Sequence, residues 1–93
     1  MIGRVRVKPG REEEALSLIE ARGVAILQGM PGSAGGYWAR SLTDGETIQH
    51  SFWLFDTEPD ARGAEATFIS LRDLPDAPAE FISVDLCEVI GQA

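Results

Sequence analysis

The sequence predicts an α+β domain in which an antiparallel sheet carries two helices on one face. Segments with strand-like and helix-like hydrophobic periodicity follow one another in the order βαββαβ. An Asp44-Gly45 dipeptide, typical of a two-residue hairpin turn, lies between the two central strand-like segments. The 93 residues also match the length of one small domain. We therefore expect residues 1–93 to form a single domain of ferredoxin-like topology.

The first part of the chain supplies a strand and a long helix. Residues 2–7 alternate valine with arginine, which places Val5 and Val7 on one face of a strand. From residue 11 to about residue 29, apolar side chains recur at helical spacing, namely Leu16, Ile19, Ile26 or Leu27, and Met30. Gly23 falls inside this run, where glycine costs roughly 1 kcal/mol relative to alanine. We expect one helix with a kink at Gly23, and two shorter helices are the alternative.

The middle of the chain predicts a β-hairpin. Residues 35–42 and 46–55 are rich in aromatic and β-branched side chains. A two-residue turn at Asp44-Gly45 fixes their register. It pairs Leu42 with Thr47, Arg40 with Gln49, Trp38 with Ser51, and Gly36 with Trp53.

The last part of the chain predicts a second helix and a final strand. Thr57 is a candidate N-cap, and Asp60 stands three residues later, as in a capping box. The apolar stripe of this helix consists of Ala61, Ala64, Phe68 and Leu71. A proline-containing turn follows, and residues 80–90 alternate as a strand.

Composition excludes several classes of function. The net charge is −7, from 15 acidic and 8 basic residues, which argues against nucleic acid and against an anionic membrane surface. Cys87 is the single cysteine and His50 the single histidine, so we expect no disulfide and no metal site. We expect Cys87 to be a small buried residue and His50 a hydrogen-bonded core residue. The N-terminal residues lack the apolar region of a secretory signal, so a cytoplasmic location is expected.

Strand alternation assigns side chains to two faces of the predicted sheet. The face expected to meet the helices comprises Val5, Val7, Tyr37, Ala39, Ile48, His50, Phe52, Leu54, Ile82, Val84 and Leu86. The other face mixes aromatic and polar residues, namely Arg4, Arg6, Trp38, Arg40, Gln49, Ser51, Trp53, Phe55, Ser83, Asp85 and Cys87. A monomer seldom exposes such an aromatic patch. We therefore expect a second copy of the chain to cover it and form a homodimer.

Three segments of the chain resemble the antibiotic biosynthesis monooxygenase-like domains. Residues 5–14 resemble their opening strand and helix start, residues 28–37 their Pro-Gly junction before the second strand, and residues 53–61 the exit from their third strand. The resemblance implies a dimeric α+β barrel, in which two protomers press their open sheet faces together. It also implies, for some members, cofactor-independent oxygenation of polycyclic phenols, and for related members the degradation of haem.

These implications yield three expectations for function. The first is a cofactor-independent monooxygenase that acts on an aromatic, polyketide-like substrate. The second is a non-catalytic barrel that binds a small apolar ligand or serves in assembly. The third is a haem-binding oxygenase. The sequence contains no asparagine, although the quinone-forming and haem-degrading members of the family rely on an asparagine in the pocket.

Three residues are candidates for catalysis. Asp85 is a candidate general base, and its alternative role is an ion pair with Arg4 or Arg6. Arg40 is a candidate for binding a phenolate or carboxylate, and its alternative is a surface salt bridge. Tyr37 is a candidate proton donor, and its alternative is a ring packed under a helix.

Two tryptophans dominate the predicted substrate-binding set. Trp38 and Trp53 are candidates for the walls of an aromatic pocket, or alternatively for the core of a dimer interface. The rest of the predicted set consists of Phe55, Ser51 and Arg6.

Overall fold

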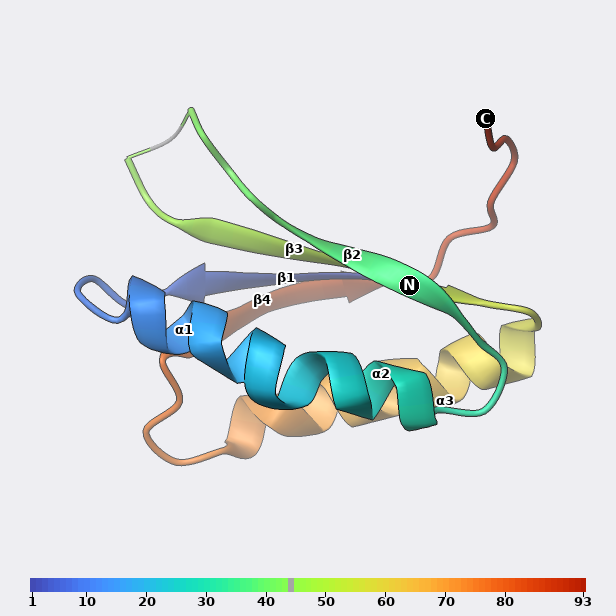
Figure 1. The fold of residues 1–93 in the computed structure, drawn as a ribbon, viewed down its shortest axis with the longest axis horizontal. Coiled ribbons are helices and arrows are strands. Elements are labelled where there is room, and N and C mark those ends of the chain that lie inside the picture. Colours follow the sequence, from blue (N-terminus) through green and yellow to red (C-terminus); the bar gives the residue numbers. More distant parts are fainter. Residues whose placement is uncertain (44) are drawn as a thin grey trace.

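A computed structural model describes residues 1–43 and 45–93 of the chain. Within these residues, one antiparallel sheet has the strand order β2-β3-β1-β4. Its strands are β1 (Ile2–Val7), β2 (Ser33–Arg40), β3 (Ile48–Phe55) and β4 (Ala79–Asp85). The helices all lie on one side of this sheet (Figure 1). The α+β class is confirmed, and the topology is compatible with a ferredoxin-like fold.

The first helical run is continuous but changes its winding at the predicted irregularity. It consists of α1 (Glu12–Leu18), a π-helical turn η1 (Ile19–Gly23) and α2 (Val24–Gly29). The backbone stays right-handed helical through Gly23, with φ −57° and ψ −46°. One run with a distortion at Gly23 is therefore the correct alternative. Leu27 is buried and Ile26 exposed, so Leu27 is the one that belongs to the buried stripe.

The second helical run begins at the predicted cap. In α3 (Glu58–Ser70), the Thr57 hydroxyl accepts a hydrogen bond from the Asp60 amide at 3.3 Å and donates one to Asp60 Oδ2 at 2.9 Å. A short 3₁₀ turn η2 (Leu71–Asp73) follows. Ala64 and Phe68 are the buried residues of α3, and the ring of Phe68 lies directly against Gly3 of β1.

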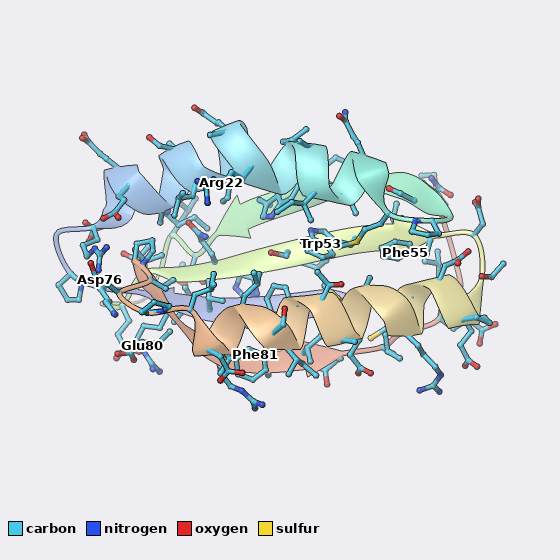
Figure 2. All side chains as sticks on the ribbon, turned by 90° about the horizontal axis from the view of Figure 1, so that it is seen from below. Arg22, Trp53, Phe55, Asp76, Glu80 and Phe81 are labelled. Carbon is cyan, nitrogen blue, oxygen red and sulfur yellow. The ribbon has the colours of Figure 1, made fainter. Side chains whose placement is uncertain are left out.

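A small aromatic core lies between the sheet and the helices. Its buried members are Met1, Leu27, Trp53, Ala64 and Phe68. The rings of Trp53 and Phe68 meet edge-on, with centroids 5.7 Å apart. Figure 2, seen from the helix side, shows Trp53 on the sheet between the two helical runs.

The predicted hairpin register is confirmed where the structure describes it. Trp38 pairs with Ser51, Arg40 with Gln49, and Gly36 with Trp53. Both strands are shorter at the turn than expected, since β2 ends at Arg40 and β3 begins at Ile48. Asp44 of the predicted turn lies outside the described residues.

The predicted sheet faces are wrong for the hairpin. In the ladder between β1 and β3, Val5 pairs with Gln49 and Gly3 with Ser51. Paired residues of an antiparallel ladder share a face. The face of Val5 and Gly3, which meets the helices, therefore carries Gln49, Ser51 and Trp53. The hairpin turn sets only the register within the hairpin, and one residue of shift against β1 reverses every side chain.

The other sheet face is open and partly apolar. One row across it runs from Tyr37 through Phe52 to Ile2, and these residues are paired in the two ladders. Tyr37 is 71% exposed, so the prediction that this ring lies under a helix is wrong. Figure 1 shows the C-terminal segment rising on this side of the sheet.

The final strand differs from its predicted alternation. Its pairing with β1 shifts between Phe81 and Ser83, so that Arg4 pairs with Ser83 but Val5 pairs with Phe81. In a regular strand, residues three apart lie on opposite faces. The bulge changes this, so that both Phe81 and Val84 face the helices. The strand ends at Asp85, and Cys87 beyond it is exposed rather than buried.

Candidate functional site

The sheet separates the predicted site residues into two groups. The helix-covered face carries Trp38, Arg40, Ser51, Trp53 and Phe55, and the open face carries Arg6, Tyr37 and Asp85. Residues on opposite faces of one sheet do not meet at one small ligand. The three catalytic candidates are therefore not brought together, because Arg40 lies on one side and Asp85 and Tyr37 on the other.

The charged residues of the open face are paired with one another. Arg4 Nη1 contacts Asp85 Oδ2 at 3.0 Å, which is the alternative role foreseen for Asp85. Arg6 Nε contacts Glu46 Oε2 at 3.1 Å, and Arg6 Nη1 lies 4.0 Å from Glu80 Oε2. These pairs are exposed, so each contributes little to stability.

His50 also lies on the open face rather than in the core. It pairs with Arg4 and Ala39 in the two ladders, and its ring stacks on that of Phe52 with centroids 6.2 Å apart. Its Nε2 lies 3.4 Å from the Ser41 hydroxyl. No cluster of metal-ligating side chains occurs among the residues that the structure describes.

A groove runs between the first helical run and β2, and Trp38 divides it into two clefts. The first cleft has a volume of about 320 Å³ and is lined by Val24, Leu27, Gln28, Ser33, Gly35, Gly36 and Trp38. The second cleft has a volume of about 220 Å³ and is lined by Leu16, Ile19, Trp38, Ala39, Arg40 and Gln49. Such mostly apolar clefts with few polar groups are typical of small-molecule sites.

Two polar side chains close the second cleft. Arg40 Nη2 donates a hydrogen bond to the backbone oxygen of Glu12 at 3.3 Å, which ties the guanidinium to the start of α1. Gln49, the partner of Arg40 in the ladder, is only 8% exposed. Arg40 and Gln49 are thus neighbours in the lining of a cleft whose other side chains, among them Trp38, are apolar. Arg40 was a sequence candidate, whereas Gln49 was not.

A row of buried polar groups follows β3 beneath the groove. Gln49, Ser51 and Trp53 are 8%, 6% and 4% exposed, at every second position of the strand. The Trp53 indole Nε1 is buried and has no hydrogen-bond partner among the described residues. An unpaired buried donor costs roughly 1–3 kcal/mol, so such groups call for an explanation. In the sequence, this row is visible as Gln49, Ser51 and Trp53 at every second position of one strand.

The π-helical turn lies against the groove at Trp38. A Cβ placed on Gly23 would be 3.6 Å from Cζ2 of the Trp38 indole. Single π-turns inside α-helices occur frequently at functional sites. The π-helical turn therefore lies next to Trp38, the residue that lines both clefts.

No family model matches the chain, and no curated protein matches it in sequence. No helix among the described residues is long and apolar enough to cross a membrane. The assignment of the site rests on its geometry.

Proposed function

We propose that the groove binds a planar aromatic phenol as its anion and that the bound anion is oxygenated without a cofactor. One observation carries this proposal: the mostly apolar cleft beside Trp38 is also lined by Arg40 and Gln49. A planar ring fits between Leu16, Ile19 and Trp38, and its ionised oxygen takes the charged end. The proposal keeps Trp38 and Arg40 from the predicted set and adds Gln49.

Arg40 and Gln49 supply the chemistry of this proposal by favouring the substrate anion. A guanidinium at the oxygen lowers the free energy of the phenolate or enolate relative to the neutral molecule. Such an electron-rich anion transfers electrons to dioxygen without a metal or flavin. In the keto tautomer of such a phenol, the ring methylene that loses a proton to give the anion is the carbon oxidised: CH₂ plus O₂ gives C=O plus H₂O. The carbon loses four electrons and the dioxygen gains four, so the reaction is balanced.

The test uses anthrone, a three-ring compound whose enolate absorbs in the near ultraviolet. The purified protein is mixed with anthrone in air-saturated buffer, and both oxygen uptake and anthraquinone absorbance are followed. One O₂ consumed for each anthraquinone formed, faster than without protein, is the expected result. No acceleration, with binding still detectable, would overturn the oxygenase proposal.

A second candidate function is binding without catalysis, and the composition of the groove favours it. The described residues that line the two clefts include no carboxylate, phenol or imidazole to remove a proton. The candidate acid–base residues Asp85 and Tyr37 lie on the other face of the sheet. Quenching of tryptophan fluorescence by anthrone without any oxygen uptake would favour this function. The described groove also contains no histidine for a haem iron, which leaves the haem expectation without support there.

The partner proposed for the open face is a second copy of the chain, giving a dimeric barrel. The chain exposes 6192 Å². A compact monomer of 10.1 kDa exposes about 5,300 Å² by the scaling of surface with mass. The chain therefore exposes about 900 Å² more than a compact monomer of its mass. Part of it lies in the C-terminal segment, where Val89 and Ile90 are exposed.

The pattern of side chains also suits this partner. The open face presents the row Tyr37, Phe52 and Ile2 flanked by arginine–carboxylate pairs, so it is less acidic than the chain as a whole. The predicted dimer is thus retained, but on different residues. Trp38 and Trp53, which were expected in the interface, lie under the helices instead.

A further inference from the structure

Trp53, whose buried indole N–H has no hydrogen-bond partner among the described residues, lies next to residues that line the first cleft. Gly36, which lines this cleft, is the ladder partner of Trp53, and a Cβ on Gly36 would lie 3.3 Å from Trp53 Cα. Leu27 lines the same cleft and belongs with Trp53 to the buried core. Trp38 lines it as well, and its ring packs edge-on against that of Trp53. Three of the cleft's walls are therefore immediate neighbours of Trp53.

We infer that Trp38 is a movable partition and that, when a ligand displaces it, the Trp53 N–H donates a hydrogen bond to a ligand oxygen. This inference rests on the proposed function, because it names a second anchor for the same ligand. It accounts for the buried donor that has no partner among the described residues. It also accounts for two clefts of about 320 and 220 Å³ that share one wall.

The surroundings of Trp38 leave it room to shift. Trp38 lines both clefts, so it borders open space in each of them. Gly23 of the π-turn faces the ring without a side chain, at a Cβ distance of 3.6 Å to Cζ2. Among the described residues, the indole of Trp38 has no hydrogen-bond partner that holds it in place. Displacing the ring joins the two clefts into one longer slot.

Two anchors at different places in this slot define the class of ligand. Arg40 at one end prefers an ionised oxygen, and the Trp53 N–H, a neutral donor only, prefers a carbonyl oxygen. The ligand class is a fused-ring aromatic that carries an acidic hydroxyl on one ring and a ketone on another. A simple phenol without the ketone uses the Arg40 anchor alone.

The indole N–H groups provide a direct test by nuclear magnetic resonance. The chain has two tryptophans, so a ¹⁵N-labelled sample gives two indole N–H signals, and Trp38→Phe removes one and assigns both. Alizarin, a dihydroxyanthraquinone with ring ketones, is compared with 2-hydroxyanthracene, which lacks them. We expect alizarin to move the Trp53 indole proton downfield by at least 0.5 ppm and the ketone-free phenol to leave it nearly unchanged.

The outcomes separate this inference from the function on which it rests. If both compounds bind and neither moves the Trp53 signal, the inference is overturned and the phenol site stands. If neither compound binds, the proposed function fails, and the inference with it.

Two variants test the roles of the tryptophans separately. Trp53→Phe keeps an aromatic ring in the core but removes the N–H, and should weaken alizarin about tenfold while leaving 2-hydroxyanthracene within twofold. Trp38→Phe replaces the partition by a smaller ring and should tighten alizarin about threefold. Tyr37→Phe, next to Trp38 but on the open face, is the control and should change neither ligand. A tenfold loss of alizarin binding in Trp38→Phe would show Trp38 to be a fixed wall and overturn the movable partition.

Discussion

The indole ring of Trp38 meets that of Trp53 edge-on, with ring centroids 6.3 Å apart and ring planes at 70°. Both rings lie on the helix-covered face, so the two tryptophans join the sheet to the helices rather than one protomer to another. Their different surroundings divide their roles, because Trp53 is buried in the core and Trp38 lines the groove above it. The candidate site is thus directly adjacent to the core.

Removing the Arg40 guanidinium should weaken binding of an anionic phenol. Arg40→Met keeps most of the apolar stem of the side chain but removes the charge at the end of the second cleft. Arg40 is exposed, and an exposed ion pair contributes about 0.2–1 kcal/mol, so we expect affinity for 2-hydroxyanthracene to fall by up to about fivefold. Fluorescence titration measures the loss. Arg62→Met, at an exposed arginine of α3, is the matched control, and an equal loss there would exclude a specific role for Arg40.

Self-association through the open face should give a particle of twice the chain mass. Light scattering at micromolar concentration is expected to report about 20 kDa for a chain of 10.1 kDa. Tyr37→Asp places a charge in the middle of the proposed interface and should shift the mass toward the monomer. Leu74→Asp is the control, because Leu74 is also an exposed apolar residue but lies in the turn before β4. A wild-type mass near 10 kDa would contradict the dimer.

The close approach of α3 to β1 depends on the absence of a side chain at residue 3. A methyl group at Gly3 would overlap the ring of Phe68. We expect Gly3→Ala to lower the free energy of unfolding by about 1–3 kcal/mol, as overpacked cores do. Urea unfolding measures this loss. The double variant Gly3→Ala with Phe68→Leu should lose less free energy of unfolding than the two single variants together. Gly63→Ala, at a position in α3 with open space around it, should instead stabilise by about 0.5–1 kcal/mol.

The N-terminal cap of α3 should contribute measurably to stability. Thr57→Ala removes the hydroxyl that accepts the Asp60 amide, and such losses typically cost about 1 kcal/mol. Thr67→Ala is the matched control in the same helix, where the hydroxyl only donates to the Gly63 carbonyl within an already bonded turn. Chemical denaturation should show a lower midpoint for the first variant alone. Equal effects of both would indicate that the cap contributes nothing beyond an ordinary exposed threonine.

The ion pair at the start of α1 predicts a pH dependence. Arg11 Nε and Nη2 donate to the two carboxylate oxygens of Glu14 at 2.7 and 2.8 Å, which holds the pKa of Glu14 below its usual value. A carboxyl group with a lowered folded-state pKa stabilises the fold above its unfolded-state pKa. That contribution is lost as the pH falls through the folded-state pKa. Glu14→Gln should therefore destabilise at neutral pH and make no difference at about pH 2.

Urea titrations of both proteins at the two pH values measure this difference. Glu13→Gln, an exposed residue of the same turn, is the control and should match the wild type at both. A destabilisation by Glu14→Gln that persisted in acid would show that the side chain acts through something other than its charge.

The sequence alone determined those features that depend on neighbouring residues. Helical periodicity and Gly23 predicted one distorted helical run, because glycine lowers the stability of a helix at its own position. Thr57 with Asp60 predicted the start of α3, since a cap involves one turn of backbone. The hairpin register followed from a short connection, and Trp38 does pair with Ser51.

Only the tertiary structure decided which way the hairpin faces. Its register against β1, where Val5 pairs with Gln49, joins strands more than forty residues apart and has no local signal. That single choice moved Trp53 and Trp38 from the expected interface into the core and the groove, and turned Tyr37 to the open face. The same holds for the site. Arg40 was predicted from its residue type, whereas its neighbour Gln49 and the Trp53 N–H, which has no partner among the described residues, could be recognised only in the packed structure. Strand alternation repeats every two residues. A shift of one residue in the pairing with β1 therefore leaves the sequence pattern unchanged but moves every side chain to the other face of the sheet.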